Sequence, residues 1–246
     1  MIAYYDRICV LIISFFIYAV AGWVWESLVC PILTHHPIHN SGFLNGPVVP
    51  IYGAGALAVS ILFSPDEKFY SIFLEGAVVA CVIEYATSYV MEKIYHRRWW
   101  DYSQMHFNLN GRICLAGFLV FGLFSVVCVM FIQPDLNQRI LAHGFIQNII
   151  VSTMLCTLIA VDFGITVAQL THLEERLETV RKELIALRSE LQEYRFTRDD
   201  IYEMLKQKQF DKLPLPLKAP ELRILKAFPQ LLNEVRHYVE GEDNES

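Results

Sequence analysis

Charged residues are scarce in this sequence, and the few that are present are unevenly placed. They make up 19% of the 246 residues, whereas a soluble domain has about 25%, and hydrophobic residues make up 54%. Residues 1–171 carry seven Lys or Arg and ten Asp or Glu, and residues 172–246 carry the other thirteen and sixteen. This distribution predicts a transmembrane domain over residues 1–171, followed by a polar C-terminal region.

Several sequence patterns that mark soluble functions are absent. There is no block of basic residues and the net charge is −6, so nothing favours binding to nucleic acid. The phosphate-binding pattern G-x-x-x-x-G-K-[ST] is missing, and any ATP-driven step would therefore need a separate ATPase subunit. The H-E-x-x-H and G-x-S-x-G patterns of zinc proteases and hydrolases are missing too. The sequence identifies no catalytic residue, and we favour a protein that is not an enzyme.

Metal and disulfide chemistry is equally poorly represented. The six cysteines all lie in or beside apolar segments and none forms a C-x-x-C pair, so we expect buried free thiols. His35, His36 and His39 form a cluster in a predicted loop, where a flexible backbone supplies converging imidazole nitrogens poorly. We expect solvated histidines there, with no bound metal and no cofactor.

Five apolar segments approach the roughly 20 residues that a helix needs to cross a bilayer. They cover residues 8–30, 48–63, 69–91, 113–133 and 145–171. The first is longer than the roughly 7–15 apolar residues of a secretory signal and no small-residue cleavage site follows, so we expect an uncleaved span. The predicted fold is all-α: a polytopic integral membrane protein with about five transmembrane helices and a C-terminal cytoplasmic helical or coiled-coil extension.

The second apolar segment is short and interrupted by glycine and proline. Pro and Gly at membrane depth are tolerated where protein or a cavity surrounds the backbone, and in transporters such segments point to a binding site. The alternative is a tilted or half-inserted helix whose glycines allow neighbouring helices to pack closely. The residues concerned are Gly46, Pro47, Pro50, Gly53 and Gly55.

Lysine and arginine predict the orientation in the membrane. The connection over residues 92–112 has four of them and the C-terminal region has thirteen, whereas the opposite side has Arg7, Lys68 and Arg139. Because cytoplasmic connections are enriched in Lys and Arg, we expect a multi-pass protein of the cytoplasmic (inner) membrane. With five spans, its N-terminus lies outside and its C-terminus in the cytoplasm.

The two connections predicted on the cytoplasmic side resemble each other. Leu44-Asn45-Gly46 precedes the second span and Leu109-Asn110-Gly111 precedes the fourth. Each follows a span with a glutamate near its cytoplasmic end, which would fit a parallel internal repeat. Chance similarity and the preference of Asn-Gly for turns are the alternative.

An apolar heptad pattern follows the fifth span. Its spacing of three and four residues predicts a coiled-coil stalk over residues 172–195 that joins copies of the chain through residues 170–194. The alternative is that the same stripe packs on the C-terminal helices of its own chain. Residues 196–246 are expected to form a cytoplasmic helical tail. The heptad residues are Leu170, Leu173, Leu177, Val180, Leu184, Leu187, Leu191 and Tyr194.

Most candidate site residues lie in the connection before the fourth span, and the others lie in the first three spans and the first connection. Carboxylates inside spans are costly and indicate function by default, and Glu26 and Glu84 lie at a depth from which Arg98 or Arg112 is within reach. One interpretation is a polar pocket open to the cytoplasm; the other is an ion-pair network that locks the helices together. The pocket candidates are Glu26, Asn45, Tyr52, Glu84, Ser88, Arg98, Trp99, Trp100, Asp101, Tyr102, Asn108, Asn110 and Arg112.

Three stretches of the sequence resemble a known family. They are FLNGPVVPIYGAGA (43–56), EYATSYVMEKIYHRRWWDYS (84–103) and FNLNGRICLAG (107–117). They are similar to motifs of the bacterial family of "putative ABC-transporter type IV" permeases, and the resemblance covers about residues 10–165. It implies a multi-pass inner-membrane protein that forms the membrane subunit of a transporter.

Together these features predict a membrane permease subunit whose substrate is unknown, with a polar pocket near the cytoplasmic face. Trp99 and Trp100 would seat the connection at the membrane interface, and an ATPase would dock on residues 92–112 or on the stalk. An alternative is a membrane scaffold or sensor that dimerises through its coiled coil. A weaker alternative is a lipid-modifying membrane enzyme in which the carboxylates do acid–base work.

Overall fold

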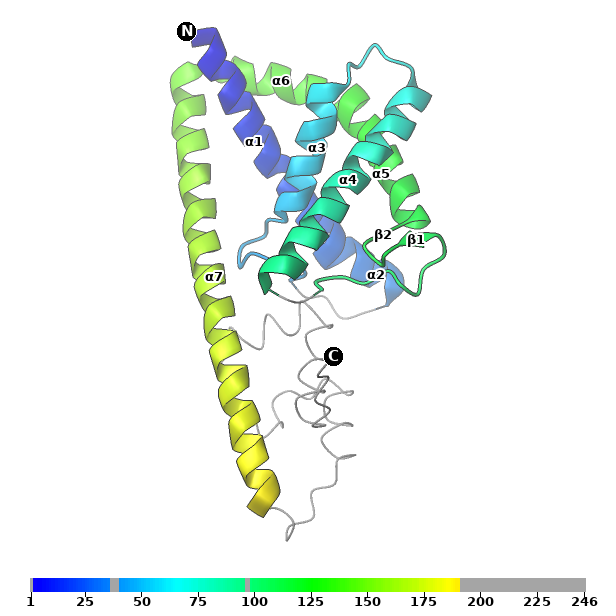
Figure 1. The fold of residues 1–246 in the computed structure, drawn as a ribbon. Coiled ribbons are helices and arrows are strands. Elements are labelled where there is room, and N and C mark those ends of the chain that lie inside the picture. Colours follow the sequence, from blue (N-terminus) through cyan, green and yellow to red (C-terminus); the bar gives the residue numbers. More distant parts are fainter. Residues whose placement is uncertain (1, 36–39, 96–97, 191–246) are drawn as a thin grey trace. The chain divides into compact units, whose positions relative to one another are not determined.

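The structure, a computed structural model, describes residues 2–35, 40–95 and 98–190. These residues form helices and one short hairpin, which agrees with the predicted helical class (Figure 1). The elements are α1 (Ile2–Val24), η1 (a π-helix, Trp25–Val29), α2 (Cys30–Thr34), α3 (Pro50–Leu62), α4 (Phe69–Tyr95), β1 (Asn108–Leu109), β2 (Ile113–Cys114), α5 (Leu115–Val127), η2 (a π-helix, Cys128–Ile132), α6 (Gln133–Ala142) and α7 (Phe145–Glu190).

Four helical stretches in the described part of the chain are long and apolar enough to cross a bilayer: Tyr5–Ile32, Phe69–Tyr95, Leu115–Ala142 and Phe145–Thr171. The predicted second span corresponds to α3, which has 13 residues and is shorter than a full crossing. The prediction of five spanning helices is therefore corrected to four long helices and one short one. Pro50 begins α3 at a position where the missing N–H costs nothing.

Helix α3, although short, runs between the same two ends of the transmembrane unit (residues 1–163) as its longer neighbours. In Figure 1 the hairpin and α2 lie at one end, and the α3–α4 connection and α6 lie at the other. The backbone of Val49 bonds to Ala19 of α1, so the non-helical stretch before α3 is packed on protein. An irregular backbone at membrane depth needs such cover.

Small residues let the helices of this unit approach closely. A Cβ atom added to Gly53 of α3 would lie 2.7 Å from the backbone oxygen of Phe15 in α1. Gly122 of α5 has the backbone oxygen of Phe73 in α4 at 2.8 Å from the same position. The close-packing explanation for the glycine in the second apolar segment thus holds at Gly53, whereas Gly55 has open space around it.

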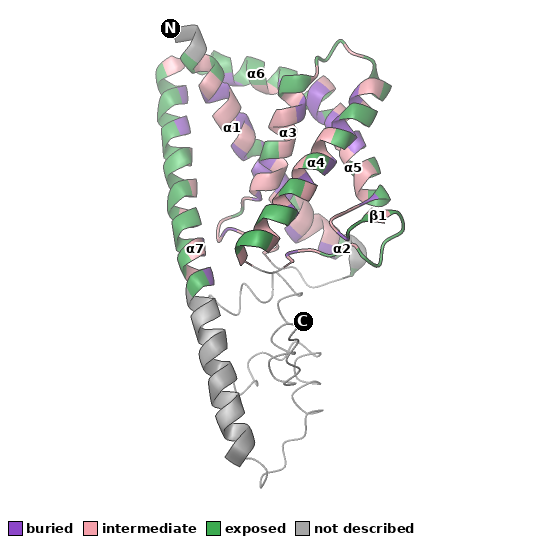
Figure 2. Cartoon of the chain, viewed as in Figure 1, coloured by how far each residue is buried: buried purple, intermediate pink, exposed green. Residues whose placement is uncertain are grey.

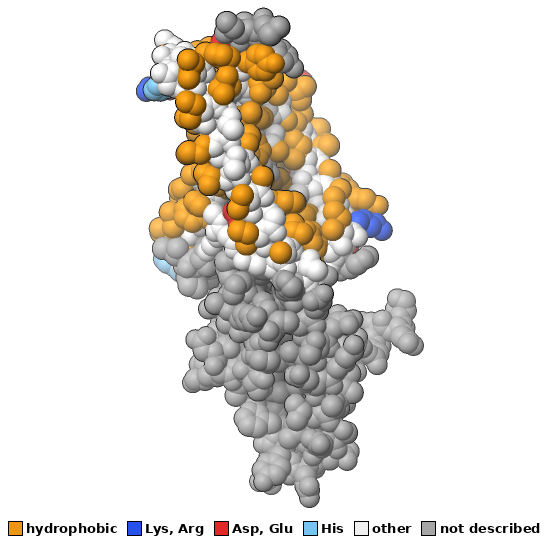
Figure 3. Space-filling model, turned by 90° about the vertical axis from the view of Figure 1, so that its left-hand side faces the viewer, with side chains coloured by type: hydrophobic (Ala, Val, Ile, Leu, Met, Phe, Trp, Pro, Cys, Tyr) orange, Lys and Arg blue, Asp and Glu red, His pale blue; other side chains and the backbone are white. Residues whose placement is uncertain are grey.

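The chain divides into two compact units, residues 1–163 and 164–246. In the first, Figure 2 shows buried residues on the facing sides of α1, α3, α4 and α5, with a core of Tyr18, Val59, Ile72, Cys128 and Val129. In the second, the structure describes the continuation of α7 to Glu190. On the face drawn in Figure 3, hydrophobic side chains are far more numerous than charged ones among the described residues, as lipid contact requires.

Part of the predicted stalk is helical, because α7 is continuous to Glu190. The side chains from residue 172 onward and the predicted tail over 196–246 lie outside what the structure describes. The coiled coil and the association of chains through residues 170–194 therefore stay predictions.

Candidate functional site

A compact hairpin connects α4 to α5. Asp101 begins a turn in which its Oδ1 accepts hydrogen bonds from the N–H and the hydroxyl of Ser103. The N–H of Tyr102 donates to the Gly111 carbonyl at 2.7 Å, and β1 pairs with β2 in antiparallel register. Gly111 has φ of +68° and lies against this turn, where a Cβ would come within 2.5 Å of Asp101 Oδ1. Only glycine fits that position without strain.

Four charged residues form an outer ion-pair cluster that ties the hairpin to the end of α4: Glu92, Arg98, Asp101 and Arg112. Arg112 Nη2 pairs with Glu92 Oε2 at 2.5 Å, and Arg98 Nε pairs with Glu92 Oε1 at 3.4 Å. Arg98 also faces Asp101 at 3.9 Å. Each carboxylate of this cluster therefore has a guanidinium partner.

The charge state of the hairpin carboxylate follows from its turn. Hydrogen bonds from the Ser103 side chain and then from its backbone lower the pKa of Asp101 below its usual value, and the charge of Arg98 acts in the same direction. Burial opposes this shift. Asp101 is thus an anion that fixes local structure.

Aromatic residues attach the hairpin to the rest of the unit. Trp99 is buried and packs edge-on against Phe43 of the first connection and Tyr95 of α4. Trp100 donates its indole N–H to the Arg112 carbonyl at 3.1 Å. Trp99 therefore packs inside the protein, between the two connections. The role of Trp100 at the membrane interface stays a prediction.

Two glutamates and two tyrosines from distant segments form an inner acidic cluster. Tyr52 of α3 donates its hydroxyl hydrogen bond to Glu26 Oε1 at 3.0 Å. Tyr102 of the hairpin donates to Glu84 Oε1 at 3.2 Å. The charges of Glu26 and Glu84 are close enough to interact, so the two pairs belong to one cluster: Glu26, Tyr52, Glu84 and Tyr102.

The pKa of Tyr102, the hairpin tyrosine of this cluster, is changed by its surroundings. Burial raises the pKa of the Tyr102 hydroxyl above its ordinary value. The charge of Glu84, the hydrogen bond to it and the charge of Glu26 all act in the same direction. Tyr102 is therefore neutral and donates its O–H to Glu84.

One oxygen of the cluster lacks a partner. Glu84 is 6% exposed, and its Oε2 accepts no hydrogen bond from the residues that the structure describes. A buried polar atom in that state costs about 1–3 kcal/mol. Such an atom is uncommon in native proteins and invites a ligand, an ion or water.

The backbone around Glu26 is unusual as well. Glu26 lies in η1, a single turn of π-helix between α1 and α2. Single π-helical turns within α-helices are frequent at functional sites. No pattern in the sequence indicated this turn.

The structure corrects the predicted partners of the two membrane glutamates. We expected Glu26 and Glu84 to reach arginines of the hairpin, but Arg98 and Arg112 pair with Glu92 and Asp101 instead. The inner carboxylates accept from tyrosine hydroxyls. The reason is position along the chain. Arg98 and Arg112 lie in the hairpin segment, close to Asp101 and to Glu92 at the end of α4, whereas Glu84 lies two turns earlier in α4.

The two Leu-Asn-Gly motifs take different conformations. Asn110 and Gly111 both have positive φ, and Asn110 donates to the Tyr85 hydroxyl at 2.9 Å. Asn45 and Gly46 are not among the described residues with positive φ; their N–H groups and the Asn45 amide hold the carboxylate of Asp162. This difference gives the predicted repeat no support.

The remaining candidates lie around these clusters. Ser88 is buried one turn from Glu84, and Asn108 braces the hairpin through the Ser103 and Met105 carbonyls. Two residues were missed. Asn40 orders the first connection by accepting from Trp23 and donating to the Leu44 and Asn45 carbonyls. Tyr85 collects donors from Asn110 and Arg112.

No group of three or more metal-ligating side chains occurs among the residues described, and His36 and His39 lie outside them. All six cysteines are free.

The motifs that build both clusters also identify the chain's relatives. The model of the family described as "Putative ABC-transporter type IV" matches residues 13–167. The chain belongs to this family. The matched residues of this ABC-transporter-type membrane protein contain the hairpin, the outer ion-pair cluster and the inner acidic cluster. No curated protein and no solved structure matches the chain.

Proposed function

We propose that this protein is the membrane permease subunit of a transporter and that the inner acidic cluster is its solute pocket, near the cytoplasmic face. The observation that carries the proposal is Glu84 Oε2, which is buried and accepts no hydrogen bond from a described residue. An ion-pair network would give each carboxylate a cation, whereas the described partners of Glu26 and Glu84 are tyrosine hydroxyls.

The chemistry of the cluster favours a particular kind of solute. Glu26 and Glu84 offer carboxylate oxygens, and Tyr52 and Tyr102 hold one oxygen of each in place. A solute that carries positive charge or several hydrogen-bond donors would satisfy the free oxygen and offset the repulsion between the carboxylates. Of the other predicted residues, Arg98, Asp101 and Arg112 belong to the outer ion-pair cluster, which would hold the hairpin, and with it Tyr102, in place.

The hairpin is the proposed docking surface for a separate ATPase subunit. It lies at one end of the transmembrane unit (Figure 1), and Gln104, Met105, His106 and Phe107 at its tip are exposed. The orientation predicted from Lys and Arg places this end in the cytoplasm, where ATP is hydrolysed.

Thermal unfolding of the detergent-purified protein with a panel of cationic and donor-rich solutes tests the pocket. A solute that binds the folded state raises the melting temperature by mass action. We expect such a solute to protect the wild type and to lose its effect in Glu84→Gln. If Glu84→Gln instead destabilises the protein without any solute, the carboxylate has a structural role and the proposal fails.

A second candidate function is a membrane scaffold or sensor. The continuity of α7 over 46 residues favours it, because such a helix can carry a membrane domain's state to a cytoplasmic partner. Deletion of residues 172–246 discriminates. If the shortened chain keeps its function, the membrane site carries that function and the scaffold fails. If function is lost while solute binding is unchanged, the C-terminal region carries the function and the scaffold is supported.

A further inference from the structure

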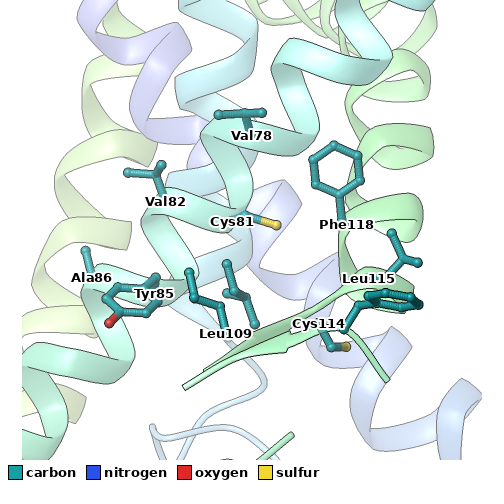
Figure 4. Close-up of a pocket in the computed structure, with 11 residues that line it drawn as sticks. Val78, Cys81, Val82, Tyr85, Ala86, Leu109, Cys114, Leu115 and Phe118 are labelled. Atoms are coloured by element: carbon teal, nitrogen blue, oxygen red, sulfur yellow. The ribbon is translucent and has the colours of Figure 1, made fainter. Parts of the chain in front are cut away.

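An apolar groove lies on the transmembrane unit between α4 and α5, on a part of α4 that the acidic cluster does not use. Its volume is about 590 Å³, within the range of roughly 300–1,000 Å³ of ligand pockets. Figure 4 shows side chains of α4, the hairpin and α5 turned toward one hollow. They include Val78, Val82, Ala86, Leu109, Leu115 and Phe118.

The groove is closed at the hairpin end by a polar group. The Tyr85 ring lines the groove, and its hydroxyl accepts hydrogen bonds from Asn110 at 2.9 Å and from Arg112 Nη1 at 3.4 Å. The Arg112 guanidinium lies over the Tyr85 ring at 5.2 Å. Its Nε is buried and bonds to none of the described acceptors. The polar end of the apolar groove is thus the Tyr85 hydroxyl, where the donor side chains of Asn110 and Arg112 meet.

The charges at this end suit a single negative charge. Arg98 and Arg112 balance Glu92 and Asp101. Lys93, whose Nζ lies 5.7 Å from the centre of the Tyr89 ring that Arg112 also covers, adds one positive charge. Arg112 is paired with Glu92 through one nitrogen. A phosphodiester carries one negative charge and several acceptor oxygens, and Arg binds it well.

The hairpin tip beside the groove is apolar and exposed. Phe107 is 83% exposed and also lines the groove. A large apolar side chain at the end of the spans is placed where acyl chains meet head groups.

We propose that this groove binds one acyl chain of a phospholipid, with the lipid phosphate held by Asn110 and Arg112 beside Tyr85. The apolar groove, the donor side chains that meet at Tyr85 and the nearby positive charge occur together and match the two halves of that molecule. The site is separate from the inner acidic cluster, because no residue of that cluster lines the groove.

Native mass spectrometry of the full-length, delipidated protein tests the proposal. Phosphatidylglycerol and a diacylglycerol with the same acyl chains are the two probes, since they differ in the phosphate. Val82→Trp fills the groove from a position that is 61% exposed, and Leu74→Trp is the matched control, 53% exposed on the same helix outside the groove. Asn110→Gly removes the amide while keeping a residue that tolerates the positive φ.

We expect the wild type and Leu74→Trp to retain phosphatidylglycerol in preference to diacylglycerol. Val82→Trp should retain about tenfold less or lower, because the acyl chain loses its contacts, and Asn110→Gly should reduce the preference for the phosphate. Equal retention by Val82→Trp and Leu74→Trp would overturn the proposal, as would equal retention of the two lipids. A groove-dependent dimer with no bound lipid would overturn it in favour of a second copy. Unchanged melting temperatures of the two Trp variants establish that both fold.

Discussion

The inner acidic cluster and the outer ion-pair cluster are built from the same residue types but make opposite use of them. Glu92 in the outer cluster has two arginines within 3.4 Å. Glu84, two turns earlier on α4, has a single tyrosine donor and one oxygen that no described residue satisfies. Paired carboxylates stabilise structure, whereas a buried and partly unsatisfied one is expensive and needs another reason to be there. The following changes test that contrast, from the largest expected effect to the smallest.

Gly111→Ala should cause the largest loss of stability, because it distorts the hairpin turn that contains Asp101 of the outer cluster and Tyr102 of the inner cluster. The new Cβ meets Asp101 and Ser103 at 2.5 Å in a left-handed backbone conformation. The expected cost is about 3 kcal/mol, measured by thermal unfolding in detergent. Gly55→Ala is the control, because it has open space within helix α3. Equal melting temperatures for the two variants would show that the hairpin does not brace the unit.

Glu92→Gln removes the shared partner of Arg98 and Arg112. We expect a loss of about 2 kcal/mol, visible as a lower melting temperature. The control is Asp135→Asn, which breaks an exposed ion pair with Arg139 on α6 and should cost less than about 1 kcal/mol. An equally small effect at Glu92 would contradict a structural role for the outer cluster.

Tyr102→Phe removes the hydroxyl that holds Glu84. Both oxygens of that carboxyl group would then lack a described donor, and the expected cost is about 1 kcal/mol. The comparison is the same substitution in the Glu84→Gln background. If Tyr102→Phe costs the same with and without the Glu84 carboxylate, the two residues are not coupled.

Acid should destabilise the outer cluster only slightly, and only at low pH. Since the folded pKa of Asp101 is below its usual value, its contribution to stability is complete above about pH 4, the unfolded value, and is lost as the pH falls through the folded pKa. Tryptophan fluorescence between pH 5 and pH 2 measures this, because Trp99 and Trp100 directly precede Asp101 in the chain. Asp101→Asn should remove the acid dependence; a change that persists in this variant belongs to another group.

Much of the fold is readable from the sequence. Runs of apolar residues predicted each of the four long helices, because a bilayer requires about 20 of them in succession. The same rule was insufficient for α3, whose pass is completed by an irregular stretch that packs on Ala19. Hydropathy registers the apolar length of a segment and does not show where its helix begins.

The residues of the candidate site could be named from the sequence, but the contacts between them could not. Glu26 and Glu84 were singled out as carboxylates inside spans and Tyr102 as part of the polar connection, whereas Tyr52 was included because it lies in a family motif. Their contacts depend on how η1, α3, α4 and the hairpin pack. The π-helical turn at Glu26 and the hydrogen bond from the Asn45 amide to Asp162 depend on the tertiary structure. Local sequence contains no signal for either.

The most direct measurement is a melting-temperature series on three proteins: wild type, Glu84→Gln and Glu92→Gln, each with and without the solute panel. We predict that Glu92→Gln melts earlier but keeps its protection by solute. Glu84→Gln should melt at or above the wild-type temperature and lose that protection. Destabilisation of Glu84→Gln to the same extent as Glu92→Gln, with solute protection unaffected by either change, would contradict the assignment of the inner cluster as the pocket.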